Sequence, residues 1–278
     1  MDIARRMWTL IEPLHAVTYF TPQARAAFEA AGLRGFWRGY FAGRAAPLGA
    51  VGAGPVEAMF FGFAPAMVRR ALPDVWNRAT PAAALIARLD GARAALSAVL
   101  PGGDLTEAAS LLRRAAEAVE LPGRPLAAAN ADLPWPEDPL GQLWHAATVL
   151  REHRGDGHVA ALLVAGLDGA ESLVWRSSLD STREVLQPAR GWTDAQWEAA
   201  TDRLAARGWL DSGAATEAAR AARDAVERQT DALAAGPWHA LGPDGTATLE
   251  KLLAPLSAAA LRLLPEPNPI VFPRAAPQ

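Results

Sequence analysis

Cysteine is absent from this 278-residue chain, and lysine occurs once, at Lys251. Without cysteine the chain forms no disulfide, no thiolate metal site and no cysteine nucleophile. It has no run of about 18 uncharged apolar residues, which a membrane-spanning helix needs. Its first 20 residues lack the apolar core and cleavage site of a signal peptide. We therefore expect a soluble, cytoplasmic protein that does not contact the membrane.

Common catalytic and nucleotide-binding motifs are missing too. The sequence has no Gly-x-Ser-x-Gly elbow, no Gly-x-x-x-x-Gly-Lys loop and no His-Glu-x-x-His pair. Gly49, Gly52 and Gly54 imitate a dinucleotide-binding loop, but no predicted strand precedes them. The net charge of −3 removes the overall attraction to phosphates that a basic protein has. DNA binding would therefore need a local basic patch.

Apolar residues recur at helical spacing along nearly the whole chain, and strand patterns are almost absent. The sequence predicts an all-α fold with minor β structure, in two helical domains over residues 1–120 and 140–265. Between them, residues 121–139 contain five prolines and are predicted to be a connection. Residues 266–278 form a proline-rich tail, predicted to pack as a strap or stay mobile. Thr21-Pro22, Thr80-Pro81 and Thr193-Asp194 predict helix starts.

Aromatic residues are concentrated in the first quarter of the chain. Both tyrosines and seven of the eight phenylalanines lie between residues 19 and 63. Such residues usually fill a core, but Arg34, Arg38 and Arg44 lie among them, and an apolar pocket with a few polar groups is the usual small-molecule site. Arg34 and Arg38 are four residues apart, so on one helix face both could hold an anion. In this half we predict ligand contacts from Glu12, His15, Tyr19, Arg38, Tyr40 and Arg44.

Glu12 and His15 have the Glu-x-x-His spacing found in di-iron helix bundles, where both side chains share a helix face. Such bundles need a second copy of the motif, and the chain has none. A structural or ligand-contacting role for His15 is therefore favoured over a metal site.

Three of the five histidines, His145, His153 and His158, lie in the stretch 142–171. We predict two helices here, joined by a charged turn over residues 151–157, with His153, Asp156 and His158 converging at it. These side chains suit zinc or iron. Alternatively, Asp156 caps the second helix and His153 lies at the carbonyl end of the first. We favour this local explanation over a metal, and add His145, His153, Asp156 and His158 to the predicted ligand contacts.

Residues 191–231 resemble the second half of a MarR-type winged helix. Leu204-Ala205-Ala206-Arg207-Gly208-Trp209-Leu210 and Thr216-Glu217-Ala218-Ala219-Arg220 are the matching pieces. Nearly the whole chain is similar to an actinobacterial helix-turn-helix family of about this length. EPLHAVTYF, GFWRGYFAGRAAPLG, LWHAATVLREHRGDGHVAALL and RGWL carry that similarity. The resemblance implies a fold, with a degenerate winged helix in the second domain, and it implies no activity.

The expected recognition helix departs from that pattern. Asp194, Glu198 and Asp202 precede its first base, Arg203, so three carboxylates would face DNA phosphates. The expected wing is reduced to Asp211-Ser212-Gly213. We therefore interpret the winged helix as a scaffold that has lost its DNA surface.

Two functional hypotheses follow, from different classes. The leading one is a protein that binds or sequesters a small, mostly apolar or aromatic ligand, or an enzyme that uses His15 or His158 as acid or base. The alternative is a ligand-responsive DNA-binding regulator that uses Gln196, Arg203 and Arg207. A homodimer is also expected. A metal- or haem-binding protein is a weaker alternative, and no metal ligand is assigned.

Overall fold

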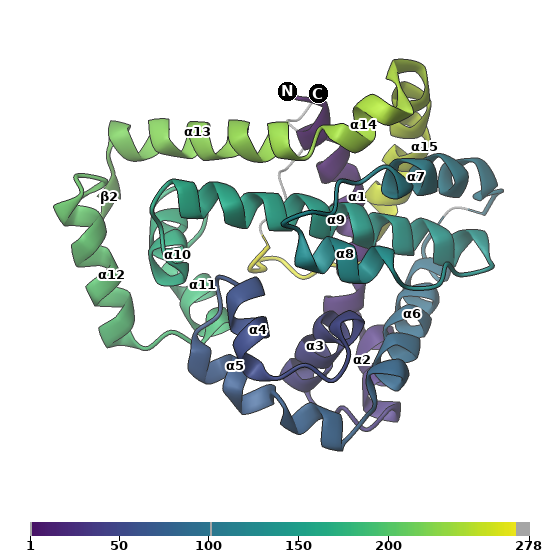
Figure 1. Cartoon of the computed structure of the whole chain (residues 1–278), viewed down its shortest axis with the longest axis horizontal. Coiled ribbons are helices and arrows are strands. Elements are labelled where there is room, and N and C mark those ends of the chain that lie inside the picture. The colour runs from purple at the N-terminus through teal and green to yellow at the C-terminus, as the bar shows by residue number, and fades with distance from the viewer. Residues whose placement is uncertain (1, 101, 271–278) are drawn as a thin grey trace.

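The computed structural model describes residues 2–100 and 102–270. Helices make up nearly all of its regular structure, and a single two-stranded hairpin is found in this part of the chain. This confirms the predicted all-α fold with minor β structure. Figure 1 shows the helices surrounding the long, central α9.

The first part of the chain forms seven α-helices and two short 3-10 helices. Thr21 and Thr80 cap α2 and α6 through their side chains, as predicted. Pro13 lies inside α1 without ending it. The elements are α1 (Ile3–Phe20), α2 (Pro22–Ala30), α3 (Phe36–Ala45), η1 (Ala46–Leu48), α4 (Ala53–Met59), α5 (Pro65–Ala71), η2 (Asp74–Asn77), α6 (Pro81–Ser97) and α7 (Thr106–Glu117).

The proline-rich segment 121–139 contains a helix of its own, α8 (Pro125–Ala131), which packs against α9 (Pro139–Val164). The predicted turn over residues 151–157 is wrong, because α9 is one continuous helix through this region. One glycine of this region, Gly157, permits close packing against other segments. A Cβ on Gly157 would lie 2.8 Å from Nη1 of Arg124 and 3.2 Å from Cβ of Leu233, so two other segments cross the helix there.

The second part of the chain begins with three helices and a hairpin. Thr193 caps α12 in a capping box with Gln196, as the predicted start at Thr193-Asp194 requires. The hairpin pairs Leu210 with Ala215 at the position predicted for the wing. The elements are α10 (Gly169–Ser177), α11 (Arg183–Arg190), α12 (Asp194–Ala206), β1 (Leu210–Asp211), β2 (Ala214–Ala215), α13 (Glu217–Leu233), α14 (Gly236–Leu241) and α15 (Pro243–Leu261).

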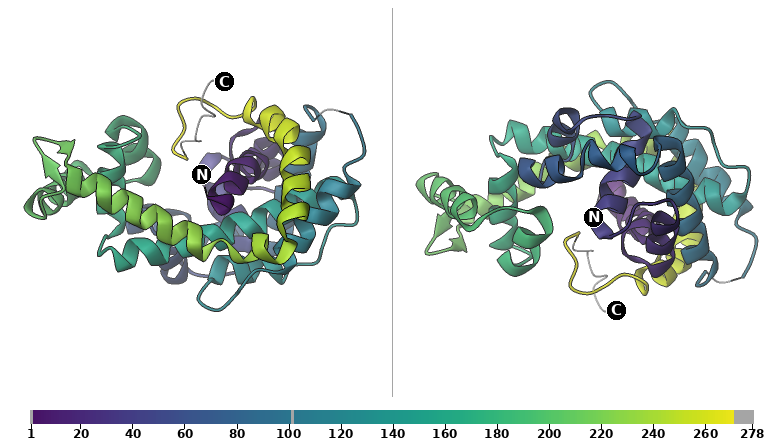
Figure 2. Two further views of the ribbon diagram at one scale, coloured as in Figure 1. Left: turned by 90° about the horizontal axis from the view of Figure 1, so that it is seen from above. Right: turned by 90° about the horizontal axis from the view of Figure 1, so that it is seen from below.

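Apolar side chains gather in three clusters. The largest joins α1, α6, α7, α9, α14 and α15, so residues from both ends of the chain share one core around Trp144 and Trp238. A second, aromatic cluster lies among α2 to α6 and buries Phe28, Phe41 and Phe60. The third lies among α10, α11, α12 and the hairpin, and α13 runs from it back to α14 (Figure 2).

No single helix in the described part of the chain is both long and apolar enough to cross a membrane. Helices α9 and α10 meet both conditions only when taken together, and they are bent by 94° at the break between them. Of the predicted tail, residues 266–270 are described, and Arg176 donates hydrogen bonds to the carbonyls of Pro269 and Ile270. Residues 271–278 lie outside the described residues.

Candidate functional site

A buried polar network lies where α1, α3 and α9 meet. It contains five of the predicted ligand contacts, Glu12, His15, Tyr19, Tyr40 and Arg44. The structure adds three residues of α9 to them, Thr148, Arg151 and Glu152. Sequence spacing could not reveal that α9 presents these three side chains to α1 and α3, since that depends on how the helices cross.

His15 sits at the centre of the network with both ring nitrogens engaged. Nδ1 lies 2.9 Å from the Thr148 hydroxyl, and Nε2 lies 2.9 Å from the Tyr19 hydroxyl. Thr148 donates its own hydrogen to the Trp144 carbonyl, so it must accept from Nδ1–H. Nε2 is then unprotonated and accepts from Tyr19. Burial, with a smaller effect of Arg151, lowers the pKa of His15 well below its usual range, so the ring is neutral.

Glu152 is the negative counter-charge to two arginines of the network, Arg44 and Arg151. Arg44 donates to both of its carboxylate oxygens, each at 3.1 Å, and Arg151 donates to one of them at 2.9 Å. Arg151 also reaches Glu12 at 3.5 Å. Burial by itself would raise the pKa of Glu152, but Arg151 and Arg44 hold it well below its usual range. Glu152 therefore stays ionised and joins α9 to α3.

Two more arginines lie beside this network without a carboxylate partner among the described residues. Arg88 donates to the Gly43 carbonyl at 3.2 Å, and its Nε has no partner there. Arg190 lies over the Phe63 ring at 4.6 Å. Burial lowers the pKa of each to about 10. The region around the tyrosines thus has more positive than negative charge, which favours a neutral or anionic ligand over a cationic one.

The remaining predicted contacts on α9 do not converge, because each has a separate partner. His153 Nε2 lies 3.2 Å from Glu120, and His158 Nδ1 lies 3.0 Å from the Thr230 hydroxyl. His145 packs edge-on against Trp135, with ring centroids 4.7 Å apart. Burial lowers the pKa of all three histidines to about 4.

Asp156 caps a helix, but not the one predicted from the sequence. Its Oδ2 accepts from the backbone nitrogens of Leu126 and Ala127 at 3.0 and 2.9 Å, so it caps the start of α8. Burial raises the pKa of Asp156 to about 6. Over residues 2–100 and 102–270, no group of three or more metal-ligating side chains is found. Metal or haem binding stays the weaker alternative prediction.

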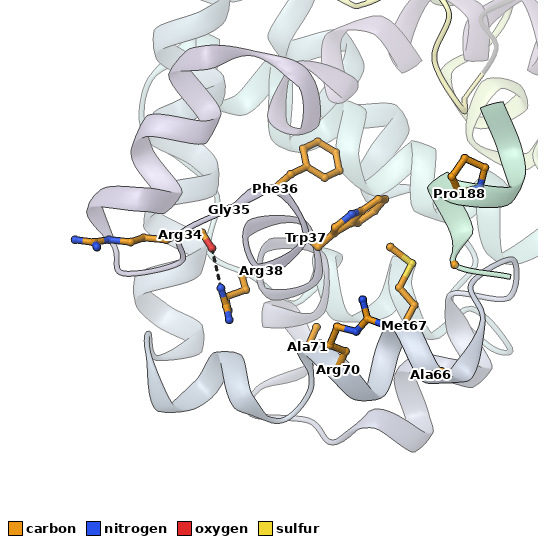
Figure 3. Close-up of a pocket in the computed structure, with 11 residues that line it drawn as sticks. Arg34, Gly35, Phe36, Trp37, Arg38, Ala66, Met67, Arg70, Ala71 and Pro188 are labelled. Carbon is orange, nitrogen blue, oxygen red and sulfur yellow. Dashed lines mark hydrogen bonds between the residues drawn. The ribbon is translucent and has the colours of Figure 1, made fainter. Parts of the chain in front are cut away.

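A pocket of about 390 Å³ lies on the other side of the aromatic cluster (Figure 3). Trp37, Met67 and Pro188 form apolar walls, and three arginines line it as well: Arg34, Arg38 and Arg70. Arg38, a predicted ligand contact, is therefore at this pocket and not in the buried network. The expectation that Arg34 and Arg38 share a helix face is wrong, because α3 begins at Phe36, and Figure 3 shows the two side chains diverging.

The pocket is built by two parts of the chain that are far apart in sequence. Its walls come from α3 and α5, and from Pro188 and Gly191 at the end of α11. A backbone hydrogen bond joins the segment before α5 to the end of α11, since Ala64 N donates to the Arg190 carbonyl at 2.9 Å. Gly191 has φ +75°, and a Cβ there would lie 2.8 Å from the Met67 sulfur. Glycine thus permits both the left-handed turn and the close approach.

The residues named for DNA contact make intramolecular bonds. Arg203 donates to Glu171 at 2.7 Å and to Asp168 at 2.6 Å, at the start of α10. Arg207 donates to the carbonyls of Ala165 and Gly166, after the end of α9. Gln196 completes the capping box of α12. Arg203 and Arg207 therefore join α12 to the start of α10 and the end of α9, and Gln196 stabilises the start of α12.

Trp37, Met67 and Arg70 were not foreseen as parts of a site. The arginines of the sequence 67–71, MVRRA, gave a weak signal, since two adjacent arginines on a short helix cannot both face the core. What the sequence does not show is that α11 closes the pocket.

Comparison with protein-family models identifies a family for this chain. No curated protein and no solved structure gives a significant match to the chain. The model of a helix-turn-helix family matches residues 4–264, which is nearly the whole length. The predicted family is thereby confirmed at this level, whereas the MarR-like part and the actinobacterial origin stay predictions. The chain belongs to this helix-turn-helix family.

Proposed function

We propose that this protein binds a small molecule in the pocket between α3, α5 and the end of α11, on a helix-turn-helix scaffold whose α12 does not read DNA. The pocket geometry supports the proposal, because one wall comes from α3 and α5 and the other from the end of α11, more than 100 residues later in the chain. Its volume falls within the range of small-molecule sites, and apolar walls with a few charged groups are typical of them. A bound ligand would contact both parts at once.

Ring contacts connect the pocket to the buried network. The ring centroids of Trp37 and Tyr40 lie 5.8 Å apart, and those of Tyr40 and Tyr19 lie 4.9 Å apart. Tyr19 in turn is hydrogen-bonded to His15. Sequestration of the ligand needs only the pocket. An enzyme that uses His15 would also need Tyr19 to release Nε2, and one that uses His158 would need access to a buried ring. We therefore favour binding over catalysis. A cytoplasmic location and a homodimer remain predictions.

The test is a thermal-shift screen of one- and two-ring apolar compounds, with neutral, anionic and cationic members. A ligand at 100 times its Kd adds about 2.7 kcal/mol to the free energy of unfolding, which for a chain of this size raises Tm by roughly 5 °C. We expect at least one class to do this. Ala66→Trp should abolish the shift, because Ala66 is an exposed residue of the pocket wall that a larger side chain would fill.

Ala199→Trp is the matched control, since Ala199 is exposed on α12 and does not line the pocket. This variant should keep the wild-type shift. A panel without any shift, or ligands that stabilise the Ala66→Trp variant as much as the wild type, would refute the proposal.

A DNA-binding regulator is the second candidate, favoured by the family and by the order α11, α12, hairpin, α13. Because Arg203 and Arg207 are already bonded within the chain, we expect no retention of promoter DNA on the protein at low salt. Gel-shift titrations across salt concentrations measure this. The opposite result would be retention of DNA in which the slope of log affinity against log salt concentration becomes shallower by about 1 for each arginine changed to alanine. That result would favour the regulator.

A further inference from the structure

Arginines outnumber acids around the pocket, and the nearby acids are already paired. Glu57 accepts two hydrogen bonds from Arg69, at 2.6 and 3.0 Å. Asp74 accepts from Arg78 at 2.9 Å. Arg70 makes no ion pair or hydrogen bond with any residue that the structure describes. Its charge is therefore available to a ligand.

The guanidinium of Arg70 is directed along the pocket. Figure 3 shows it beside Met67 and beneath the Trp37 ring, whereas Arg34 extends away from them. Arg38 donates to the Arg34 carbonyl at 3.3 Å and lies 3.9 Å from Asp74, so its charge is partly engaged. Arg70 is thus the cation best placed to meet a group that lies against Trp37.

The apolar walls favour a flat ligand. The Trp37 ring is half-buried and held edge-on by Phe36, with centroids 4.7 Å apart, so one part of its surface remains open to the pocket. Met67 and Pro188 form the opposite side. Aromatic rings pack well on indole and thioether groups. A planar ring between these walls would bring its substituent toward Arg70.

We propose that the ligand of this pocket is an aromatic molecule with one anionic group, its ring packed between Trp37 and Met67 and its anion bound to Arg70. This inference rests on the proposed function and names its ligand class. A carboxylate can accept two parallel hydrogen bonds from a guanidinium, which makes this pairing stronger than a bond between neutral groups.

Isothermal titration calorimetry with three probes tests the ligand class: 2-naphthoate, the neutral 2-naphthalenemethanol and the aliphatic octanoate. We expect 2-naphthoate to bind about tenfold more tightly than either of the others. Arg70→Gln should weaken 2-naphthoate by about the same factor and leave 2-naphthalenemethanol within about twofold of wild type. Arg69→Gln is the control, since its neighbouring guanidinium is held by Glu57, and it should bind like the wild type.

The outcomes separate this inference from the proposed function. Equal affinity for 2-naphthoate and 2-naphthalenemethanol, or an Arg70→Gln variant that binds 2-naphthoate normally, overturns the anionic part and leaves small-molecule binding in place. Equal affinity for octanoate overturns the aromatic part. If none of the three probes binds and the wider thermal-shift panel also fails, both proposals are overturned.

Discussion

Replacing Glu152 with glutamine is expected to lower the free energy of unfolding by about 3 kcal/mol, because it leaves buried cations without their counter-charge. The Glu152 side chain is 2% exposed, and those of its partners Arg44 and Arg151 are 12% and 16% exposed, so water screens these ion pairs little. Glutamine keeps the shape and the hydrogen-bonding oxygen but not the charge. Urea denaturation followed by circular dichroism measures the change.

Two further variants show whether the effect comes from this network. The double variant with Arg44→Gln should lose clearly less stability than the sum of the two single changes, because the second change removes a cation that the first left unpaired. Glu29→Gln removes the exposed partner of Arg25 and should not shift the urea midpoint measurably. Additive losses in the double variant would contradict the assignment of Glu152 as the shared counter-charge.

Lowering the pH from 7.5 to 5.0 is expected to lower the free energy of unfolding by several kcal/mol. His145, His153 and His158 each have a folded-state pKa of about 4, against 6.5 for the free side chain. Between these values the unfolded chain binds more protons than the folded one, so stability falls as the pH drops from about 6.5 to 4. At pH 5, each of these buried histidines lowers the free energy of unfolding by about 1–2 kcal/mol. His15 acts in the same direction.

Asp156 opposes this trend. Its folded-state pKa of about 6 lies above the usual 3.8, so the folded chain binds the extra proton and this group favours folding as the pH falls from about 6 to 4. Its effect is about 1 kcal/mol at pH 5, which is smaller than that of the histidines together. The net result is therefore lower stability in acid.

Urea denaturation at pH 7.5 and 5.0 measures how much the free energy of unfolding changes with pH, for the wild type and for His158→Gln. Glutamine can still donate to Thr230 but does not titrate, so this variant should lose about 1–2 kcal/mol less stability than the wild type over the same interval. His239→Gln is the control, because the His239 ring is exposed in the folded chain. A wild-type protein as stable at pH 5.0 as at pH 7.5 would show that the histidines are not buried as described.

Local signals explain which helices the sequence revealed. Thr21, Thr80 and Thr193 each accept a hydrogen bond from the backbone nitrogen three residues further on, and such caps depend only on neighbouring residues. The same reasoning failed at residues 151–157. Two glycines and an aspartate there looked like a turn, but Asp156 caps α8, which begins about thirty residues earlier in the chain.

The candidate site was foreseen in part. Glu12, His15, Tyr19, Tyr40 and Arg44 do come together, because they lie on α1 and α3, which only α2 and two brief loops separate. Arg203 and Arg207 could not be assigned from the sequence, since their partners on α10 and after α9 lie more than thirty residues away. Whether an arginine is free for a ligand or engaged within the chain depends on such distant contacts.

The sequence by itself determined the helical fold, the family and the absence of cysteine chemistry, because periodicity, caps and composition are properties of neighbouring residues. The tertiary structure alone decided that Glu152 balances two buried arginines, that α11 closes a pocket on Trp37, and that Arg70 rather than Arg34 is directed along it. These features arise where helices from distant parts of the chain cross, and burial there sets both the charge state and the accessibility of each side chain.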